Sequence, residues 1–428
     1  MKVSVIGAGL AGCEASLQLA NAGIQVDLYD IKPQSFTPAH VDPNFCELVC
    51  SNSLKSDTLD FATGLLKQEM RMLDCQVLDM AYRCRVPAGK TLSVDRQKFA
   101  SMVTEAICSN PLINVICREV TTIPDGIVII ATGPLTTHAF SEHLRDILGQ
   151  DFYFYDAIAP IISADSIDMQ SVFVANKFDN SQDGDYINCP MTKSQYEEFC
   201  TLLVNAERVK LHDFEDPKVF EGCMPVEVMA NRDINTLRCG PLKSNGLVLP
   251  DGTTPYACVQ LRKENIAGDA YNMVGFQTNL TYPEQKRIFR TIPGLENCEF
   301  LRYGVMHRNT YINAPRHLNH YFQLKSNPNV FFAGQISGIE GYVESIASGL
   351  MVGINVSRYI RKMPLIEFTI NTCLGALGNY LESASEHNFQ PMHINWGLLM
   401  PINVPKAHKK QAMCDRALAE ITKIKETI

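Results

Sequence analysis

The sequence predicts an α/β fold with a parallel sheet, because three stretches each contain a short apolar strand that ends at glycine. The first is KVSVIGAGLAGCEASLQLANAG, residues 2–23. The second is GIVIIATGP, residues 126–134, and the third is NVFFAGQISGIEGYVESIASGL, residues 329–350. Short apolar runs bounded by turn signals are typical of parallel strands buried on both faces. In the first and third stretches the glycines lead into a helix, as expected when strands and helices alternate.

Three glycines follow the first strand in the pattern G-x-G-x-x-G. In a dinucleotide-binding turn the first glycine permits the tight turn, the second lets the backbone approach a pyrophosphate, and the third lets the helix pack closely on the strand. The helix expected at residues 11–22 points its free N–H groups at that phosphate. A second strand ends in an aspartate, whose carboxylate can hold the ribose hydroxyls. We therefore expect an adenine dinucleotide to be bound by Gly7, Ala8, Gly9, Leu10, Ala11, Gly12 and Asp30.

The order of these motifs resembles that of flavoproteins built from two dinucleotide domains. They share an N-terminal fingerprint, a middle strand ending in Ala-Thr-Gly, and a late strand ending in Ala-Gly before a helix. The resemblance implies a Rossmann-like FAD-binding fold, with further contacts to FAD from Gly133, Gly334 and Gly341. No second G-x-G-x-x-G is present in the sequence. We therefore expect no separate domain for NADH or NADPH, which would visit the flavin only transiently.

These motifs divide the chain into four expected parts. Residues 1–155 begin the FAD-binding domain, residues 156–325 form an inserted α+β substrate domain, residues 326–362 return to the FAD-binding domain, and residues 363–428 form a C-terminal extension of helix and loop packed on the core. Within the first part, the helical spacing of Leu59, Ala62, Leu65, Leu66 and Met70 predicts a helix around residues 58–73.

The composition of the chain limits the kinds of partner that the protein is expected to bind. The chain has 428 residues, 46% of them hydrophobic and 20% charged, and no apolar run approaches the length of a membrane-spanning helix. We expect a cytoplasmic protein whose fifteen cysteines are reduced thiols. The net charge of −8 disfavours binding of nucleic acid by bulk electrostatics. An RNA partner would need a local basic patch, and the candidates are residues 82–98 and 406–411.

Further stretches, in one order through most of the chain, resemble the folate- and FAD-dependent tRNA (uracil-5-)-methyltransferases. They include ELVCSNSL at 47–54, VPAGKTLSVDR at 86–96, FEGCMPVEVMA at 220–230 and YGVMHRNTYI at 303–312. The resemblance implies methylation of carbon 5 of a uridine, in the family the T-loop uridine 54 of tRNA, which becomes ribothymidine. It also implies that 5,10-methylenetetrahydrofolate provides the carbon and that FAD reduced by NADH or NADPH provides the electrons.

Two cysteines occupy functional positions in this resemblance. Carbon 5 of uracil is a poor nucleophile until a group such as a thiolate adds to carbon 6. We expect Cys223 to be that nucleophile and Cys50 to be its helper, as the base that removes the C5 proton, and the reverse assignment stays open. Carboxylates at Glu221 and Glu227 would raise the pKa of a thiol that they faced. The mechanism therefore predicts that they point away or that a cation intervenes.

Other residues have weaker assignments. Tyr342 is the candidate aromatic neighbour of the flavin ring. His307, Arg308 and Asn309 either bind folate or a nucleotide, or form a buried structural network.

Three alternative functions remain beside the methylation of tRNA. They are the same chemistry on a ribosomal RNA uridine, a flavin oxidoreductase of small molecules, and an RNA-binding assembly factor that FAD merely stabilises. The absence of a C-x-x-C pair argues against a disulfide reductase. The presence of both Cys50 and Cys223 argues against the non-catalytic alternative.

Overall fold

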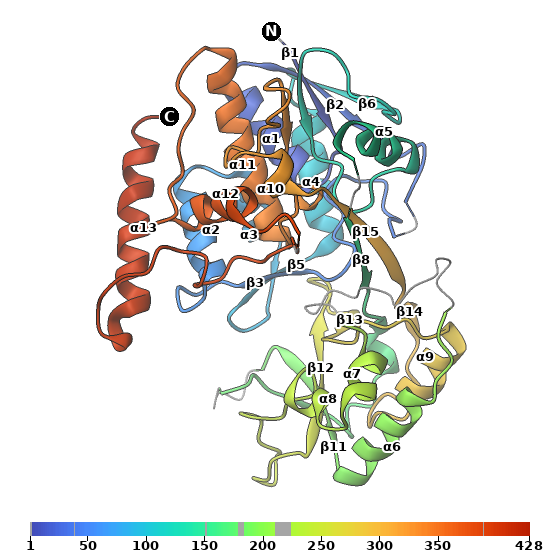
Figure 1. Ribbon diagram of the computed structural model, residues 1–428. Helices are drawn as coiled ribbons and strands as arrows, with labels where there is room; N and C mark the ends of the chain where they lie inside the picture. The colour runs from blue at the N-terminus through green and yellow to red at the C-terminus, as the bar shows by residue number, and fades with distance from the viewer. Residues whose placement is uncertain (1, 38, 150–151, 179–183, 210–223, 388) are drawn as a thin grey trace.

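The structure is a computed structural model that describes residues 2–37, 39–149, 152–178, 184–209, 224–387 and 389–428. Figure 1 shows two bodies, an upper one that contains both chain ends and a lower one made from the middle of the chain.

A five-stranded sheet lies in the upper body. Every neighbouring pair of its strands is parallel, and their order is β16-β7-β1-β2-β6. The strands are β1 (Lys2–Ile6), β2 (Gln25–Asp30), β6 (Ile113–Cys117), β7 (Ile127–Ile130) and β16 (Val330–Phe332). Three of the five come from the glycine-ended stretches, and their apolar side chains are buried. The predicted α/β fold with a parallel sheet is thus confirmed.

Two helices pack closely side by side against this sheet. They are α1 (Leu10–Asn21) and α11 (Tyr342–Ile360). The backbones approach closely where Gly349 of α11 faces Ala11 of α1, since a Cβ atom on Gly349 would lie 2.3 Å from the carbonyl oxygen of Ala11. This contact brings the N-terminal ends of the two helices to the same edge of the sheet.

The remaining elements of the upper body surround this centre (Figure 1). They are a small sheet in the order β3-β5-β4, with β3 (Ser53–Ser56), β4 (Arg85–Val86) and β5 (Thr91–Val94), and the helices α2 (Ala62–Met72), α3 (Gln76–Arg83), α4 (Arg96–Cys108), α5 (His138–Leu148), α10 (Ala314–His317), α12 (Cys373–Ser383) and α13 (Lys409–Lys425). The helix predicted around 58–73 begins later, at Ala62, because Phe61 before it has an extended backbone. Leu59 therefore lies outside the helix.

The lower body is built on a six-stranded sheet whose neighbouring strands are antiparallel, in the order β10-β11-β12-β13-β9-β14. Its strands are β9 (Ile161–Ser163), β10 (Phe173–Val174), β11 (Tyr186–Met191), β12 (Ala257–Lys263), β13 (Ala270–Met273) and β14 (Phe300–Arg302). Its helices are α6 (Lys193–Val204), α7 (Val226–Arg232), α8 (Thr236–Cys239) and α9 (Tyr282–Phe289). Figure 1 shows an antiparallel ribbon of β8 (Phe152–Ala157) and β15 (Met306–Tyr311) between the bodies.

The two bodies have separate hydrophobic cores. The core around the parallel sheet takes residues from 3–148 and 311–424, and the core of the lower body takes residues from 159–298. Residues 311–324, which we expected to belong to the inserted domain, contribute to the core around the parallel sheet. We therefore propose an inserted domain that ends before Tyr311.

Among the described residues, no helix combines the length and the apolar character needed to cross a membrane.

Candidate dinucleotide site and thiol loop

A cavity lies at the carboxyl ends of the parallel strands, the edge at which open α/β sheets bind ligands. Its walls are the turn after β1, the end of β2, the loop after β7, the turn after β16 and the first turns of α11. The cavity is lined by most of the residues that the sequence predicts to hold the cofactor: Gly7, Ala8, Gly9, Leu10, Ala11, Asp30, Gly133, Gly334 and Tyr342. Gly12 and Gly341 do not line it.

The three glycines of the fingerprint differ in the space around them. Gly7 has a positive φ of 100°, and its N–H donates to the carbonyl oxygen of Tyr29 at 2.7 Å. A Cβ atom on Gly12 would lie 1.8 Å from the carbonyl oxygen of Gly7, so the strand and the helix require glycine there. A Cβ atom on Gly9 would meet nothing within 4 Å. Gly9 therefore faces open space, as the approach of a pyrophosphate requires.

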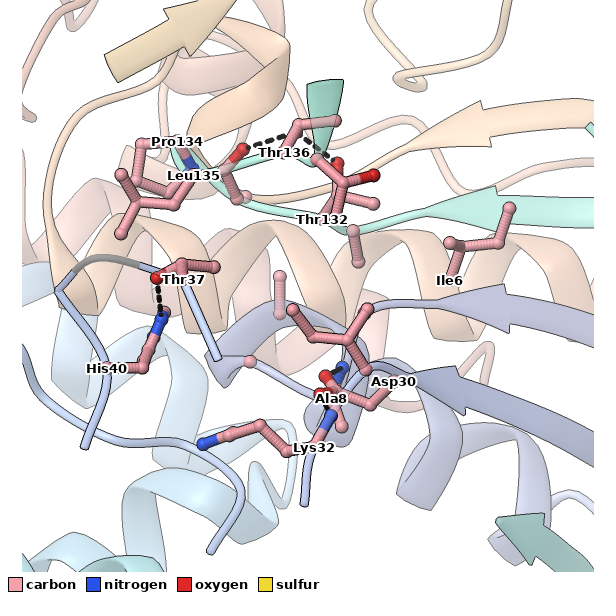
Figure 2. Close-up of a pocket in the computed structure, with 18 of the residues that line it drawn as sticks. Ile6, Ala8, Asp30, Lys32, Thr37, His40, Thr132, Pro134, Leu135 and Thr136 are labelled. Atoms are coloured by element: carbon pink, nitrogen blue, oxygen red, sulfur yellow. Dashed lines mark hydrogen bonds between the residues drawn. The ribbon is translucent and has the colours of Figure 1, made fainter. Parts of the chain in front are cut away.

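The carboxylate of Asp30 is held by backbone N–H groups. Oδ2 accepts a hydrogen bond from the Ala8 N–H at 2.7 Å, and Oδ1 accepts one from the Lys32 N–H at 2.8 Å. Figure 2 shows Asp30 directed toward Ala8 below the cavity. These bonds fix the carboxylate at the end of β2, and each oxygen keeps a further lone pair with which a ribose hydroxyl could bond.

The helix ends at this cavity suit an anionic ligand. Gly9 is the N-cap of α1 and Gly341, with φ of 115°, is the N-cap of α11, and neither helix has a side-chain hydrogen bond at its cap. The first N–H groups of such helices favour phosphate oxygens. The open space at Gly9, the anchored Asp30 and the uncapped helices together fit the pyrophosphate and ribose of FAD.

Several polar lining residues were missed from the sequence. Thr37 and His40 form a hydrogen bond of 2.6 Å, and Thr132 and Thr136 form another of 2.6 Å (Figure 2). Arg118, directly after β6, places its guanidinium 5.5 Å from the centre of the Tyr29 ring. The signal for Arg118 was present, since the residue that follows any strand of a parallel sheet lies at the ligand edge. Thr37, His40, Thr132 and Thr136 lie in loops, and no sequence pattern marked them as residues that line a ligand site.

Tyr342 joins the cavity to Cys50. Its phenolic oxygen accepts hydrogen bonds from the N–H groups of Cys50, at 2.8 Å, and Ser51, at 3.4 Å. Burial, and next the neighbouring Cys50 thiol, raise the pKa of Tyr342, so its hydroxyl stays protonated. Sγ of Cys50 lies 3.8 Å from the carbonyl oxygen of Ala157 and is partly exposed. Cys50 therefore lies beside the cavity, behind a residue that lines it.

The loop around Cys50 is also held from the side of the inserted domain. Nη1 of Arg96 donates to the carbonyl oxygens of Leu48 and Val49, while Nε of Arg96 forms an ion pair with Glu264. The buried side chain of Asn52 donates to the carbonyl oxygens of Val94 (3.0 Å), Lys263 (2.9 Å) and Glu264 (3.3 Å) and accepts from Nε of Arg262 (2.9 Å). Residues on both sides of Cys50 are thus fixed, and the backbone of this loop has little freedom.

Cys223 and Glu221 lie outside the described residues. The chain that follows is described, and there the Val226 N–H donates to the carbonyl oxygen of Gln277 at 2.8 Å. The carboxylate of Glu227 is buried and accepts from the Thr278 hydroxyl at 2.9 Å and the Asn279 N–H at 2.7 Å. Burial raises the pKa of Glu227. The Glu227 carboxylate therefore forms its hydrogen bonds inside the lower body.

The His-Arg-Asn run lies in the ribbon between the bodies. His307 and Arg308 belong to β15, and their side chains are not among those described. Asn309 in the same strand is buried. The structure thus leaves their predicted contact with folate or a nucleotide as a prediction.

A second polar cluster, also missed, lies at the start of α11. Nζ of Lys55 is 2.6 Å from Nδ1 of His393 and 3.4 Å from Oε1 of Glu344. The Glu344 side chain is fully buried and accepts from the Ile394 N–H at 3.1 Å. Burial, and next the Lys55 charge, lower the pKa of His393. The cluster ties the chain after Cys50 to the C-terminal extension.

Comparisons with known proteins add the family context. A family model described as glucose inhibited division protein A matches residues 2–364. The methylenetetrahydrofolate--tRNA-(uracil-5-)-methyltransferase TrmFO of Brevibacillus brevis is 51% identical over 424 residues, 98% of this chain and 97% of that protein. The protein of the same name from Acetivibrio thermocellus is 51% identical over 429 residues, 100% of this chain and 98% of that protein.

Among solved structures, GidA of Aquifex aeolicus in its form II crystal has a TM-score of 0.73 and 14% sequence identity. The match covers 100% of this chain and 73% of that one. At this identity the likeness concerns the fold alone, and it agrees with the FAD-binding fold predicted from the sequence.

Proposed function

This chain belongs to the family of the methylenetetrahydrofolate–tRNA-(uracil-5-)-methyltransferases, and from that membership we propose that it methylates carbon 5 of a uridine in tRNA. The uridine is that of the T-loop, and the product is ribothymidine. The carbon donor is 5,10-methylenetetrahydrofolate, and the electron source is FAD reduced by NADH or NADPH. We place the reaction in the cytoplasm.

The observation that carries this proposal is the contact between Tyr342 and Cys50. The thiol of Cys50 lies beside a cavity whose residues fit a dinucleotide. Tyr342 lines that cavity, and its phenolic oxygen accepts a hydrogen bond from the backbone N–H of Cys50. The mechanism proposed here uses a thiol and a reduced flavin at one place. A flavin oxidoreductase of small molecules gives no reason for fixing the Cys50 loop from two domains.

FAD, when bound, supplies the electrons that convert a folate methylene into a methyl group. Gly9 and the first N–H groups of α1 would hold its pyrophosphate, Asp30 would hold the adenosine ribose, and Gly334 and the start of α11 would provide further contacts. We propose that Tyr342 lies beside the flavin ring, where its fixed hydroxyl keeps the Cys50 backbone at a constant distance from the cavity.

The two cysteines perform the uracil chemistry. The thiolate of Cys223 adds to carbon 6, and the electron pair of the C5–C6 double bond moves so that carbon 5 becomes enolate-like and attacks the methylene carbon. Cys50 then takes the proton from carbon 5. The electron pair left on carbon 5 expels the folate nitrogen from the methylene carbon and forms an exocyclic double bond. Addition of a hydride equivalent to that carbon then completes the methyl group, restores the C5–C6 double bond and expels the Cys223 thiolate. The roles come from the family resemblance, and the exchanged assignment predicts a different result in the test below.

The test uses Cys223→Ala and Cys50→Ala side by side with the unchanged chain. Each protein is incubated with unmodified tRNA, methylenetetrahydrofolate and NADPH, and 5-methyluridine is measured by mass spectrometry after digestion of the RNA. We expect both variants to retain flavin, and Cys223→Ala to form no covalent adduct with a tRNA that carries 5-fluorouridine at the target. An adduct formed by Cys223→Ala but not by Cys50→Ala would exchange the roles. Full methylation by both variants would exclude this mechanism.

A further inference from the structure

Aromatic and basic side chains gather where the segment after Cys50 meets helix α13. Phe61 is 53% exposed, and Nζ of Lys410 lies 6.0 Å from the centre of its ring. The indole N–H of Trp396 donates to the carbonyl oxygen of Asp60 at 3.3 Å, and Nζ of Lys410 donates to the same oxygen at 2.9 Å. We define the aromatic–basic surface as Phe61, Trp396 and Lys410, together with Lys406 and Lys409, which precede Lys410 in the chain at the start of α13.

The lysines of this surface have no carboxylate partner at ion-pair distance in the part of the chain that the structure describes. Lys406, Lys409 and Lys410 are exposed, and the first turn of α13 contains no acidic residue. None of the ion pairs among the described residues involves any of the three. In a chain with a net charge of −8, this is a local positive patch.

The other basic segment predicted from the sequence, residues 82–98, differs in this respect. Arg83 pairs with Asp79 at 2.7 Å, Arg85 pairs with Asp57 at 3.3 Å, and Arg96 is engaged with Glu264 and the Cys50 loop. Three of its five basic residues thus already have carboxylate partners. Of the two basic segments, the one in the aromatic–basic surface is therefore the better candidate for binding an anion.

Two segments connect this surface to the thiol loop. One runs from Cys50 to Phe61, and the other contains both His393 and Trp396. They touch where Lys55 contacts His393. Eleven residues of extended chain reach at most about 40 Å, so the surface lies within that distance of Cys50. A single stem-loop can therefore span both.

We propose that the aromatic–basic surface binds the substrate RNA, with an unstacked base against Phe61 and backbone phosphates on the lysines. Stacking of a base on an aromatic ring contributes about 1–3 kcal/mol, and lysines on phosphates add a salt-dependent term. An acidic protein segment would use the lysines but gives no reason for an exposed ring beside them. The inference rests on the proposed function, which requires an RNA substrate, and it identifies where that RNA is held outside the reacting site.

The chain offers a direct probe, because Trp396 is its single tryptophan. We expect its fluorescence to be quenched when tRNA is titrated into the flavin-loaded protein, with a midpoint that rises steeply with salt. Phe61→Leu removes the ring but keeps an apolar side chain, and should weaken RNA binding about tenfold. Phe178→Leu makes the same change at an exposed phenylalanine of the inserted domain and serves as the matched control.

The lysines are tested separately from the ring. Lys406→Gln with Lys409→Gln should lower the slope of log Kd against log salt by about one for each phosphate that the variant no longer binds. In methylation assays, Phe61→Leu should raise KM for tRNA and leave kcat unchanged, because the ring holds RNA outside the reacting site. Poly-glutamate in place of RNA tests the acidic-segment alternative.

The outcomes separate this inference from the proposed function. Quenching by RNA that Phe61→Leu weakens supports the surface, even if no 5-methyluridine forms and the proposed function fails. Methylation of tRNA with neither quenching nor an effect of Phe61→Leu overturns the surface while the function stands. Equal quenching by poly-glutamate and by RNA also overturns it.

Discussion

The glycines of the fingerprint differ in whether the fold leaves room for a Cβ atom. Gly12 is required by the fold, because any Cβ atom there would overlap the carbonyl oxygen of Gly7. Gly9 has an ordinary φ of −78° and open space around it, so the fold alone does not require glycine at that position. We therefore propose that the requirement for glycine at this position comes from the ligand. The same motif thus contains one position that serves packing and one that serves binding.

A matched pair of substitutions separates these roles. Gly9→Ala should fold normally, since nothing within 4 Å opposes its methyl group, but should bind FAD more weakly because the methyl occupies the approach of the pyrophosphate. Gly12→Ala should fail to accumulate as folded protein. The measurement is the ratio of flavin to protein absorbance after purification, with circular dichroism for folding. Normal flavin content in Gly9→Ala would refute the assigned role.

At the scale of elements, a buried acid joins two helices that are distant in sequence. Glu69 of α2 is fully buried and accepts from the N–H groups of Cys373 (2.8 Å) and Leu374 (2.9 Å) at the start of α12. It supplies acceptors for N–H groups that the first turn of a helix leaves without partners. Burial raises the pKa of this carboxyl to about 8. We therefore expect the stability of the contact between α2 and α12 to depend on pH.

The sign of this dependence follows from linkage. Between the ordinary pKa of 4.5 and about 8, the folded chain holds a proton on Glu69 that the unfolded chain releases. The contribution of this group to stability is therefore greatest below pH 4.5, falls by up to about 1.4 kcal/mol per pH unit between 4.5 and about 8, and is constant above that range. Glu69→Gln should remove this decline. Urea midpoints at pH 5.5, 6.5 and 7.5 would show it, whereas parallel curves for both proteins would contradict the raised pKa.

The elements that could be predicted from sequence are those with local signals. The strand, turn and helix at residues 2–23 were predictable because each glycine acts on its immediate neighbours. The Tyr342–Cys50 hydrogen bond joins residues 292 positions apart, and no local pattern encodes it. The late start of α2 was missed for a related reason. Leu59 matched the helical spacing, but Phe61 is extended and the preceding segment contacts α13 instead.

On the scale of the whole molecule, the thiol loop is one of the places where the two bodies contact each other. Arg96 and Asn52 connect it to β12 and to the residue after that strand, and Tyr342 connects it to α11. A small apolar cluster that includes Val49, Ile158 and Val305 reinforces the junction. The position of Cys50 therefore depends on both bodies at once. Such an arrangement suits an enzyme whose flavin is held by one domain and whose substrate domain is inserted into it.

The source of the methyl carbon tests the central claim most directly. The flavin-loaded protein is given unmodified tRNA, NADPH and methylenetetrahydrofolate with carbon-13 in its methylene group, and a parallel sample receives a carbon-13 methyl sulfonium donor instead. The account predicts that 5-methyluridine in the T-loop gains the label from folate alone. Label from the sulfonium donor, or folate-derived label that enters ribosomal RNA but not tRNA, would contradict it.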